Sequence, residues 1–157
     1  MYQVRDAEMR DVYVLADIIK RVLDESITYS HLTFDRDKTA NFLVDGIKKR
    51  KGTFLRIIVD ETDTPVGGLM GWVQEPVTSR DIVADDITMM VDVEHRGKCI
   101  KQFLQVIMEY KDWAVSENAK LIKIGISSGM KVDSASRFLE KLGFERVGAV
   151  HAFRVGV

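Results

Sequence analysis

The stretch VDVEHRGKCI, residues Val91 to Ile100, decides how this sequence is interpreted. It runs from strand-forming residues through Arg96, Gly97 and Lys98 directly into an apolar helical pattern. A strand that enters a helix through such a turn directs several backbone N–H groups and a helix N-terminus at one point in space. Glycine there permits a positive φ and lets an anion approach the backbone. The stretch predicts a phosphate-binding turn; the alternative is an ordinary solvated turn.

The composition limits what such a turn can serve. The chain has 157 residues, of which 46% are hydrophobic and 30% charged, and this predicts a single domain over residues 1–157. The net charge of −1 supplies no global field for holding a nucleic-acid backbone. A lone cysteine, Cys99, excludes an internal disulfide and supplies no cysteine cluster for zinc, so no metal is expected.

The N-terminal sequence is charged throughout, and no apolar run approaches the roughly 20 residues that a membrane-spanning helix needs. We therefore expect a soluble protein without a targeting signal or a membrane partner. Together with the cysteine usage, this favours a cytoplasmic location.

Apolar periodicity and turn residues predict the elements along the chain. We expect strands at 2–5, 54–60, 66–74, 87–93 and 121–127, helices from 11, around 42–47, at 100–116 and at 134–142, and one or two strands within 144–155. The order β-α-α-β-β-β-α-β-α-β combines an antiparallel first half with one β-α-β unit, whose strands lie parallel. The fold class is α/β with a mixed sheet, and the glycine turn lies inside the β-α-β unit.

Two motifs carry a family resemblance. The segment VDVEHRGKCIKQFL resembles the signature of the GCN5-related N-acetyltransferases (GNAT), in which a strand runs through Val-x-Pro-Glu-x-Arg-Gly-x-Gly into a helix. LIKIGISSG, followed by SASRFLEKLGFERVG, is similar to the second signature of that superfamily. TYSHLTFD, DWA and GISSG also resemble a bacterial and phage branch whose substrates are mostly unassigned. The resemblance implies a twisted mixed sheet in which the parallel fourth and fifth strands splay apart to admit acetyl-coenzyme A (acetyl-CoA).

The resemblance also implies a role for each part of the predicted cofactor site. Main-chain groups of one strand would pair with the pantetheine amides and polarise the thioester carbonyl; these belong to Met90, Val91, Asp92 and Val93. Backbone N–H groups at the start of the following helix would hold the pyrophosphate; these belong to Arg96, Gly97, Lys98, Cys99, Ile100 and Lys101. Hydroxyls after the next strand would contact the thiol end or the outer arm of the cofactor; these are Ser127, Ser128 and Ser134.

Four residues depart from the family pattern, of which Val93, in place of the usual proline, affects little beyond turn rigidity. Cys99 and Lys101 fill positions where the family has Gly or Ala, and their side chains narrow the space for phosphates. Leu139 stands where many relatives place a tyrosine that protonates the departing thiolate, and such a loss slows turnover by roughly 10²–10⁴-fold. These departures leave catalytic activity open. A nucleophilic role for Cys99 is not expected, because no His–Asp pair accompanies it.

Two carboxylates are candidates for the general base that takes a proton from the acceptor amine. Asp86, which we expect just before the fourth strand, is the first, because partial burial there would raise its pKa. The alternative is a surface aspartate beside Asp85. Glu75, at the end of the preceding strand, is the second candidate. On the acceptor side, the resemblance points to Tyr29, His31 and Phe34, although His31 can equally be an ordinary loop residue. Met89, Met90 and Trp72 are expected to form core or channel walls.

The sequence thus predicts an N-acetyltransferase that moves an acetyl group from acetyl-CoA to a primary amine by direct attack in a ternary complex. The acceptor can be a small metabolite, a modified nucleobase amine in a phage setting, or a protein lysine or N-terminus; other nucleic-acid partners are not expected. The alternative is a catalytically impaired GNAT-like domain that binds acyl-CoA or serves as a phage virion-associated structural protein. Homodimer formation stays open.

Overall fold

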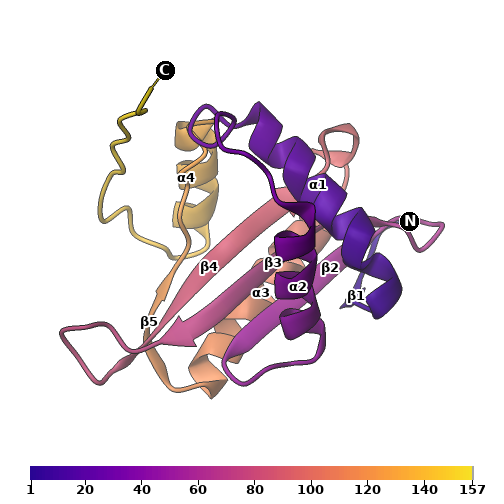
Figure 1. The fold of residues 1–157 in the computed structure, drawn as a ribbon. Coiled ribbons are helices and arrows are strands. Elements are labelled where there is room, and N and C mark those ends of the chain that lie inside the picture. The colour runs from indigo at the N-terminus through magenta and orange to yellow at the C-terminus, as the bar shows by residue number, and fades with distance from the viewer. Residues whose placement is uncertain (157) are drawn as a thin grey trace.

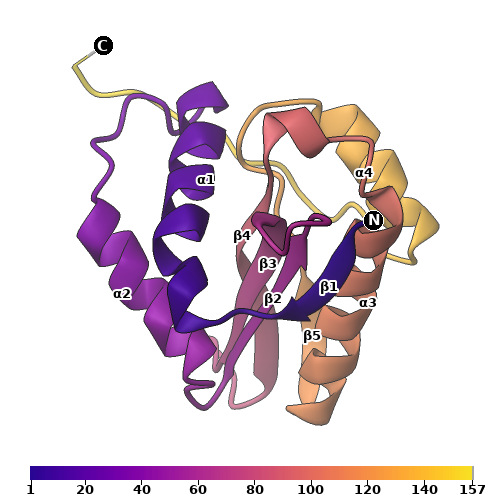
Figure 2. The ribbon, with the colours of Figure 1, turned by 90° about the vertical axis from the view of Figure 1, so that its right-hand side faces the viewer.

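The computed structural model describes residues 1–156, which form a five-stranded sheet between two layers of helices (Figures 1 and 2). The strands are β1 (Gln3–Asp6), β2 (Thr53–Val59), β3 (Pro65–Gln74), β4 (Ile82–Val91) and β5 (Ala119–Lys123). The helices are α1 (Val12–Glu25), α2 (Arg36–Ile47), α3 (Ile100–Ser116) and α4 (Val132–Lys141), with short 3₁₀ turns at Met9–Asp11 and Val93–His95.

The sheet order follows the chain, β1-β2-β3-β4-β5. The first four strands pair antiparallel, and β4 and β5 pair parallel, as the β-α-β unit predicts. Figure 2 shows α1 and α2 on one face of the sheet and α3 and α4 on the other. The mixed α/β fold class predicted from the sequence is confirmed.

Each face of the sheet has its own apolar core. On the first face, the periodic apolar side of α1 is buried, with Leu15 and Ile18 packing over Ile57 and Met70 of the sheet. On the second, α3 buries Val106, Ile107 and Tyr110 against the sheet. The two cores are what hold β4 in place, because it contributes side chains to both.

Three strand predictions need correction. β5 spans Ala119–Lys123 and not residues 121–127, because the chain separates from β4 after Lys123. β4 begins at Ile82, five residues before the expected start, because its two aspartates hide the strand pattern. Both are accommodated: Asp85 pairs with Lys123 at 2.9 Å, and Asp86 accepts a hydrogen bond from the Gly125 backbone. Asp86 therefore lies inside the strand and not before it.

The predicted final strands are wrong. Residues 144–156 form neither helix nor strand, although they contain FERVGAVHAFRV. Phe144 packs at the edge of the second core, but the later large apolar side chains do not reach a core: Val147 is 85% and Phe153 91% exposed. The core interpretation of Trp72 is also wrong, since this side chain is 41% exposed where β3 extends past the buried part of the sheet.

Candidate functional site

The site begins where β4 and β5 part. Backbone pairing between them runs from Ile82↔Ala119 to Asp85↔Lys123 and then stops, because β5 ends at Lys123 while β4 continues to Val91. Figure 1 shows the chain after β5 turning toward α4 while β4 continues across the sheet. The predicted splay of the fourth and fifth strands is confirmed, and it leaves the second half of β4 unpaired on that side.

A β-bulge lies at this point of separation. Met70 of β3 pairs with Thr88 and the next residue, Gly71, pairs with Asp86, so Ile87 is an extra residue in β4. Gly71 is required there, since a Cβ would lie 2.5 Å from the Tyr110 ring beneath it. Bulges bend a strand and re-aim its side chains, and this bulge lies directly after the last residue of β4 that pairs with β5.

The separation opens into a cleft of about 1090 Å³, which is just above the usual range for small-molecule sites. Its walls come from all three layers of the fold. The second half of β4, from Asp86 to Val91, forms the floor. The remaining walls are the end of α1, one side of α2, the turn before α3 and the segment between β5 and α4. An apolar cleft with a few convergent polar groups is the usual form of a ligand site.

The turn before α3 presents free hydrogen-bond donors. Unpaired backbone N–H groups cluster there: within residues 1–156, none of those of Gly97, Cys99, Ile100, Lys101 and Gln102 has an acceptor. Gly97 adopts φ +79°, and a Cβ at this position would meet no atom within 4 Å, so the turn is open on that side. Free N–H groups at the positive end of a 17-residue helix suit an anion such as phosphate.

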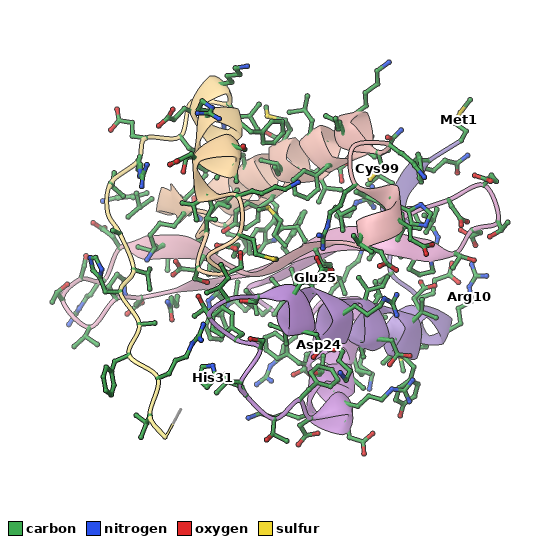
Figure 3. The ribbon with its side chains drawn as sticks, turned by 90° about the horizontal axis from the view of Figure 1, so that it is seen from above. Met1, Arg10, Asp24, Glu25, His31 and Cys99 are labelled. Atoms are coloured by element: carbon green, nitrogen blue, oxygen red, sulfur yellow. The ribbon has the colours of Figure 1, made fainter. Side chains whose placement is uncertain are left out.

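The side chain of Arg96 is already engaged. Its Nε donates to the Val91 carbonyl at 2.9 Å, and its two terminal nitrogens donate to the Glu25 carboxylate at 2.7 and 3.2 Å. A second ion pair joins Arg21 to Asp92. Both link α1 to the end of β4, and in Figure 3 Glu25 lies on the side of α1 that faces the sheet. At the turn itself, the anion-binding capacity therefore comes mainly from the backbone.

Asp86 lies at the base of the split and lines the cleft. Its Oδ1 accepts a hydrogen bond from the Gly125 N–H at 2.7 Å, while its other carboxylate oxygen has no partner among residues 1–156. Burial raises the pKa of Asp86 above its ordinary value, and the Gly125 N–H opposes this only in part. A half-satisfied carboxylate with a raised pKa in a cleft is suited to accept a proton.

The predicted thiol-end and acceptor residues meet at the far wall of the cleft. The Tyr29 hydroxyl donates to Ser127 Oγ at 2.7 Å, joining the loop after α1 to the segment after β5. Ser26 Oγ donates to the Ser128 carbonyl at 3.0 Å. The sequence contains no local signal for this contact, because about 100 residues separate the two segments.

The structure divides the predicted cofactor residues into two groups. Those that line the cleft are Met90, Val91, Arg96, Gly97, Cys99, Ile100, Ser127 and Ser128. Those that do not line it are Asp92, Val93, Lys98, Lys101 and Ser134. The carboxylate of Asp92 accepts from the Val93 N–H and pairs with Arg21, and the latter lowers its pKa. Of the second group, Lys101 still offers its backbone N–H at the turn.

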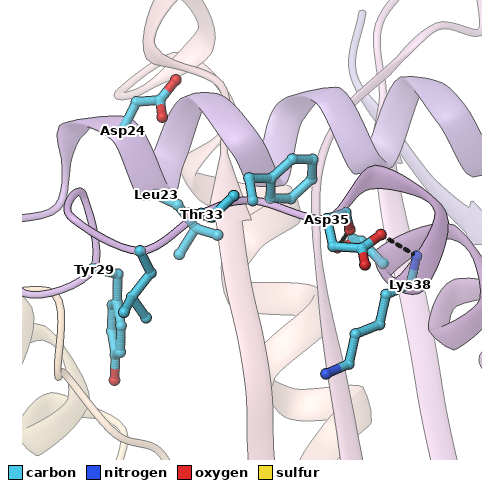
Figure 4. Close-up of a pocket in the computed structure, with 9 residues that line it drawn as sticks. Leu23, Asp24, Tyr29, Thr33, Asp35 and Lys38 are labelled. Atoms are coloured by element: carbon cyan, nitrogen blue, oxygen red, sulfur yellow. Dashed lines mark hydrogen bonds between the residues drawn. The ribbon is translucent and has the colours of Figure 1, made fainter.

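The predicted acceptor residues are divided as well. Tyr29 lines the cleft, and together with Phe34 it also lines an adjoining pocket of about 470 Å³, shown in Figure 4. His31 is exposed and lines neither cavity; Figure 3 shows it out on the loop. Glu75, the second candidate base, is also exposed and lies outside both cavities, near the end of β4 that pairs with β5.

Two of the departures from the family pattern are buried. Cys99 is 2% exposed, and its Sγ donates to the His95 carbonyl at 3.5 Å. Burial raises the pKa of this thiol, whereas a nucleophilic thiol needs a lowered pKa. Leu139 is 6% exposed and belongs to the core between α4 and the sheet. The side chain at this position packs inward and does not line the cleft.

Several cleft residues were missed by sequence reasoning. The polar side of α2 faces the cleft through Lys38, Asn41 and Asp45, while Ala40 and Leu43 face the core. Their spacing along a helix is the signal that could have found them. Glu25 and Gly125 carried no such signal, since their roles depend on partners distant in sequence.

Two other kinds of site are absent from residues 1–156. No group of three or more His, Cys, Asp or Glu side chains is placed to hold a metal ion. No helix in this part of the chain has both the length and the apolar character needed to cross a membrane.

Comparison with known proteins gives a structural result only. No protein-family model matches this chain, and no curated protein matches it by sequence. Among solved structures, glucosamine-6-phosphate N-acetyltransferase from Arabidopsis thaliana is similar, with a TM-score of 0.71 and 13% identity over 99% of each chain. AAC(6')-Iy, solved with the bisubstrate analogue CoA-S-monomethyl-acetylneamine, gives a TM-score of 0.72 at 11% identity over 98% of this chain and 97% of that one.

A transcriptional regulator from Bacillus halodurans is similar too, with a TM-score of 0.69 and 19% identity over 98% of this chain and all of the other. Neighbours of this fold therefore carry more than one description. At these identities the likeness concerns architecture, and it agrees with the strand order, the parallel β4–β5 pair and the split between them. This chain has the fold of the GCN5-related N-acetyltransferases.

Proposed function

We propose that this protein is an N-acetyltransferase that moves an acetyl group from acetyl-CoA to a primary amine. The observation that carries the proposal is the cleft at the β4–β5 split, closed at one end by a turn with unpaired N–H groups. A long ligand with an anionic end suits this shape, because the diphosphate meets the turn while the pantetheine arm follows the unpaired edge of β4.

The cleft residues can be assigned roles in the reaction. The amine nitrogen attacks the thioester carbonyl carbon, a C–N bond forms, the C–S bond breaks and the thiolate leaves. Asp86 takes the proton that the amine must lose, either directly or through a water. Main-chain N–H groups between Ile87 and Val91 polarise the carbonyl, as the strand is unpaired there.

The charges around the acceptor side favour a cationic amine. Carboxylates of Asp24 and Asp35 line the smaller pocket, and those of Asp45 and Asp86 line the cleft. Lys38 is the positive side chain that both cavities share (Figure 4). An amine with additional positive charge, such as an amino sugar or a lysine in a peptide, is therefore a better acceptor than an anionic one.

The alternative is a domain that binds acyl-CoA without efficient turnover. The observation that favours it is the buried Leu139, because a leucine in the core cannot protonate a thiolate. In this alternative the protein binds acyl-CoA in the cleft but does not catalyse acetyl transfer efficiently.

Two measurements test the proposal. Isothermal titration with acetyl-CoA tests binding, and thiol release across a panel of cationic, neutral and anionic amines tests transfer. Binding with thiol release for cationic amines supports the N-acetyltransferase. Binding without thiol release supports the alternative, and no heat at millimolar acetyl-CoA overturns both.

A further inference from the structure

The Tyr29–Ser127 hydrogen bond is not used in the chemistry above. Tyr29 lies in the loop between α1 and α2, and Ser127 in the segment between β5 and α4. Both line the cleft, and the phenol hydrogen is directed at Ser127 Oγ over 2.7 Å. Because Ser127 accepts this hydrogen, its own hydroxyl hydrogen is free to point elsewhere. It has no acceptor among residues 1–156.

The pair is held by a framework of its own. Ser26, which is 2% exposed, donates to the Ser128 carbonyl and accepts from the N–H groups of Thr28 and Tyr29 at 3.2 and 3.0 Å. The Thr28 N–H also donates to the Ser128 carbonyl at 3.3 Å. The backbones on either side of the Tyr29–Ser127 contact are therefore fixed to one another before any ligand binds.

Three other hydroxyl or thiol groups of the cleft have their hydrogens occupied, and the two that do not, Thr88 and Ser128, have no second hydroxyl hydrogen-bonded behind them. Ser26 donates to Ser128, the Thr39 hydroxyl donates to the Asp35 carbonyl, and Cys99 donates to the His95 carbonyl. The position that would hold a donor on α4 is Leu139, inside the core. The Ser127 hydroxyl is thus a preorganised hydrogen-bond donor for a thiolate that forms in this cleft. Tyr29, which donates to Ser127, can replace the proton that Ser127 gives up.

We propose that Tyr29 and Ser127 form a proton relay to the leaving thiolate, an inference that rests on the proposed acetyl transfer. As the C–S bond breaks and sulfur takes the electron pair, Ser127 gives its hydroxyl proton to sulfur. Tyr29 gives its phenol proton to Ser127 in the same step, and water restores the proton on Tyr29, which is half-buried and so reachable by solvent. Asp86 releases to water the proton that it took from the amine, so the products are the thiol, the amide and an unchanged protein.

The test compares Tyr29→Phe, Ser127→Ala, the double variant and Ser127→Thr, each assayed for thiol release and for acetyl-CoA affinity. We expect Tyr29→Phe and Ser127→Ala each to lower kcat by about 10–100-fold, at or below the lower end of general acid catalysis. The loss is no larger because water can also protonate the thiolate. The dissociation constant of acetyl-CoA and KM for the amine should stay within about threefold. Because the two groups act as a unit, the double variant should be no slower than the slower single variant. Ser127→Thr, which keeps the hydroxyl, should retain most of kcat.

Tyr13→Phe and Ser30→Ala are the matched controls: Tyr13 is exposed on α1 and Ser30 is exposed on the same loop as Tyr29, and neither lines the cleft. A kcat of Ser127→Ala within threefold of the wild type, or effects of the two single variants that multiply in the double variant, would overturn the relay and leave the acetyl transfer standing. A wild-type protein that binds acetyl-CoA and releases no thiol with any amine would overturn both.

Discussion

Asp86 accepts a hydrogen bond from the Gly125 backbone at the first position beyond the last β4–β5 residue pair, Asp85↔Lys123. This contact marks the end of the continuous sheet and the start of the cleft. It also holds a half-buried carboxylate beside the edge of β4 where the thioester is proposed to lie. Asp86 therefore makes a structural contact and also has a proposed catalytic role, and substitutions at this position can distinguish the two.

Replacing Asp86 by Asn should lower kcat/KM by about 10²–10⁴-fold, because an amide cannot take the proton of the amine. The amide oxygen can still accept from Gly125, so the split should persist and acetyl-CoA affinity should change little. Initial rates and calorimetry measure the two effects. Asp85→Asn is the matched control: its carboxylate pairs with Lys123 outside the cleft, and its loss should cost about 0–1 kcal/mol of stability with little change in rate. Equal losses of rate in the two variants would contradict a specific role for Asp86.

The pH dependence of Asp86 has opposite signs for activity and stability. Its pKa is raised by burial, so kcat/KM should rise with pH as the carboxyl ionises, and this limb should disappear in Asp86→Asn. For stability, a raised folded-state pKa means that folding favours the protonated form. The contribution of Asp86 is greatest below its unfolded-state pKa and falls as pH rises through the folded-state pKa. Thermal unfolding should show Asp86→Asn to be more stable than the wild type at pH 7, and this difference should shrink toward pH 3.

Replacing Gly97 by Glu should weaken acetyl-CoA binding by about 10²–10³-fold, since two like charges about 4 Å apart in a partly screened site repel by about 4 kcal/mol. The residue also has to adopt φ +79°, which costs a non-glycine residue roughly 1–2 kcal/mol of stability. Gly143→Glu controls for this cost, because Gly143 has φ +87°, has no neighbour within 4 Å of its Cβ direction and lies outside the cleft. Both variants should lose similar stability, and only Gly97→Glu should lose affinity. Unchanged affinity in Gly97→Glu would show that the diphosphate lies elsewhere.

Replacing Glu25 by Gln should strengthen acetyl-CoA binding by about 2–10-fold at low salt, a modest effect because surface charges are screened. The change removes a carboxylate from the cleft wall and frees the guanidinium of Arg96 from its ion pair. Titration at two salt concentrations measures it, and the gain should shrink at high salt. Glu140→Gln, on the exposed side of α4, should leave affinity unchanged. Weaker binding by Glu25→Gln would mean that the Arg96–Glu25 pair is needed to shape the turn.

Replacing Leu139 by Tyr should destabilise the fold by about 1–3 kcal/mol, because a larger, polar side chain has to enter a packed core. It should not raise kcat, since the position does not line the cleft. Chemical denaturation and rate measurements test both statements. A faster enzyme would show that α4 can place a donor at the thiolate and would weaken the case for Tyr29 and Ser127.

The sequence predicted the order of the elements from β1 to α4. The helix from Ile100 to Ser116 agrees with its prediction, because a long apolar period is a local property of the chain. Prediction failed where local pattern and burial disagree. Asp85 and Asp86 disguised the start of β4, and the apolar alternation of residues 144–155 suggested strands where no partner strand is present among residues 1–156.

For the candidate site, the sequence named the turn at Gly97, the two serines after β5 and Asp86, which line the cleft, because each follows from a short motif or from a resemblance to one. It did not separate residues that line the cleft from those that do not. His31, Glu75 and Ser134 were named together with Tyr29 and Ser127, and only the packing of loops against the sheet distinguishes them.

The sequence by itself determined that a strand enters a helix through a positive-φ glycine, because backbone conformation and helix periodicity depend on near neighbours. Only the tertiary structure decided that β4 bulges at Ile87, that Arg96 is held by Glu25, and that Tyr29 meets Ser127. These contacts join segments up to about 100 residues apart, and their geometry depends on how two helical layers pack on one sheet. No local sequence pattern encodes a contact between segments that lie so far apart along the chain.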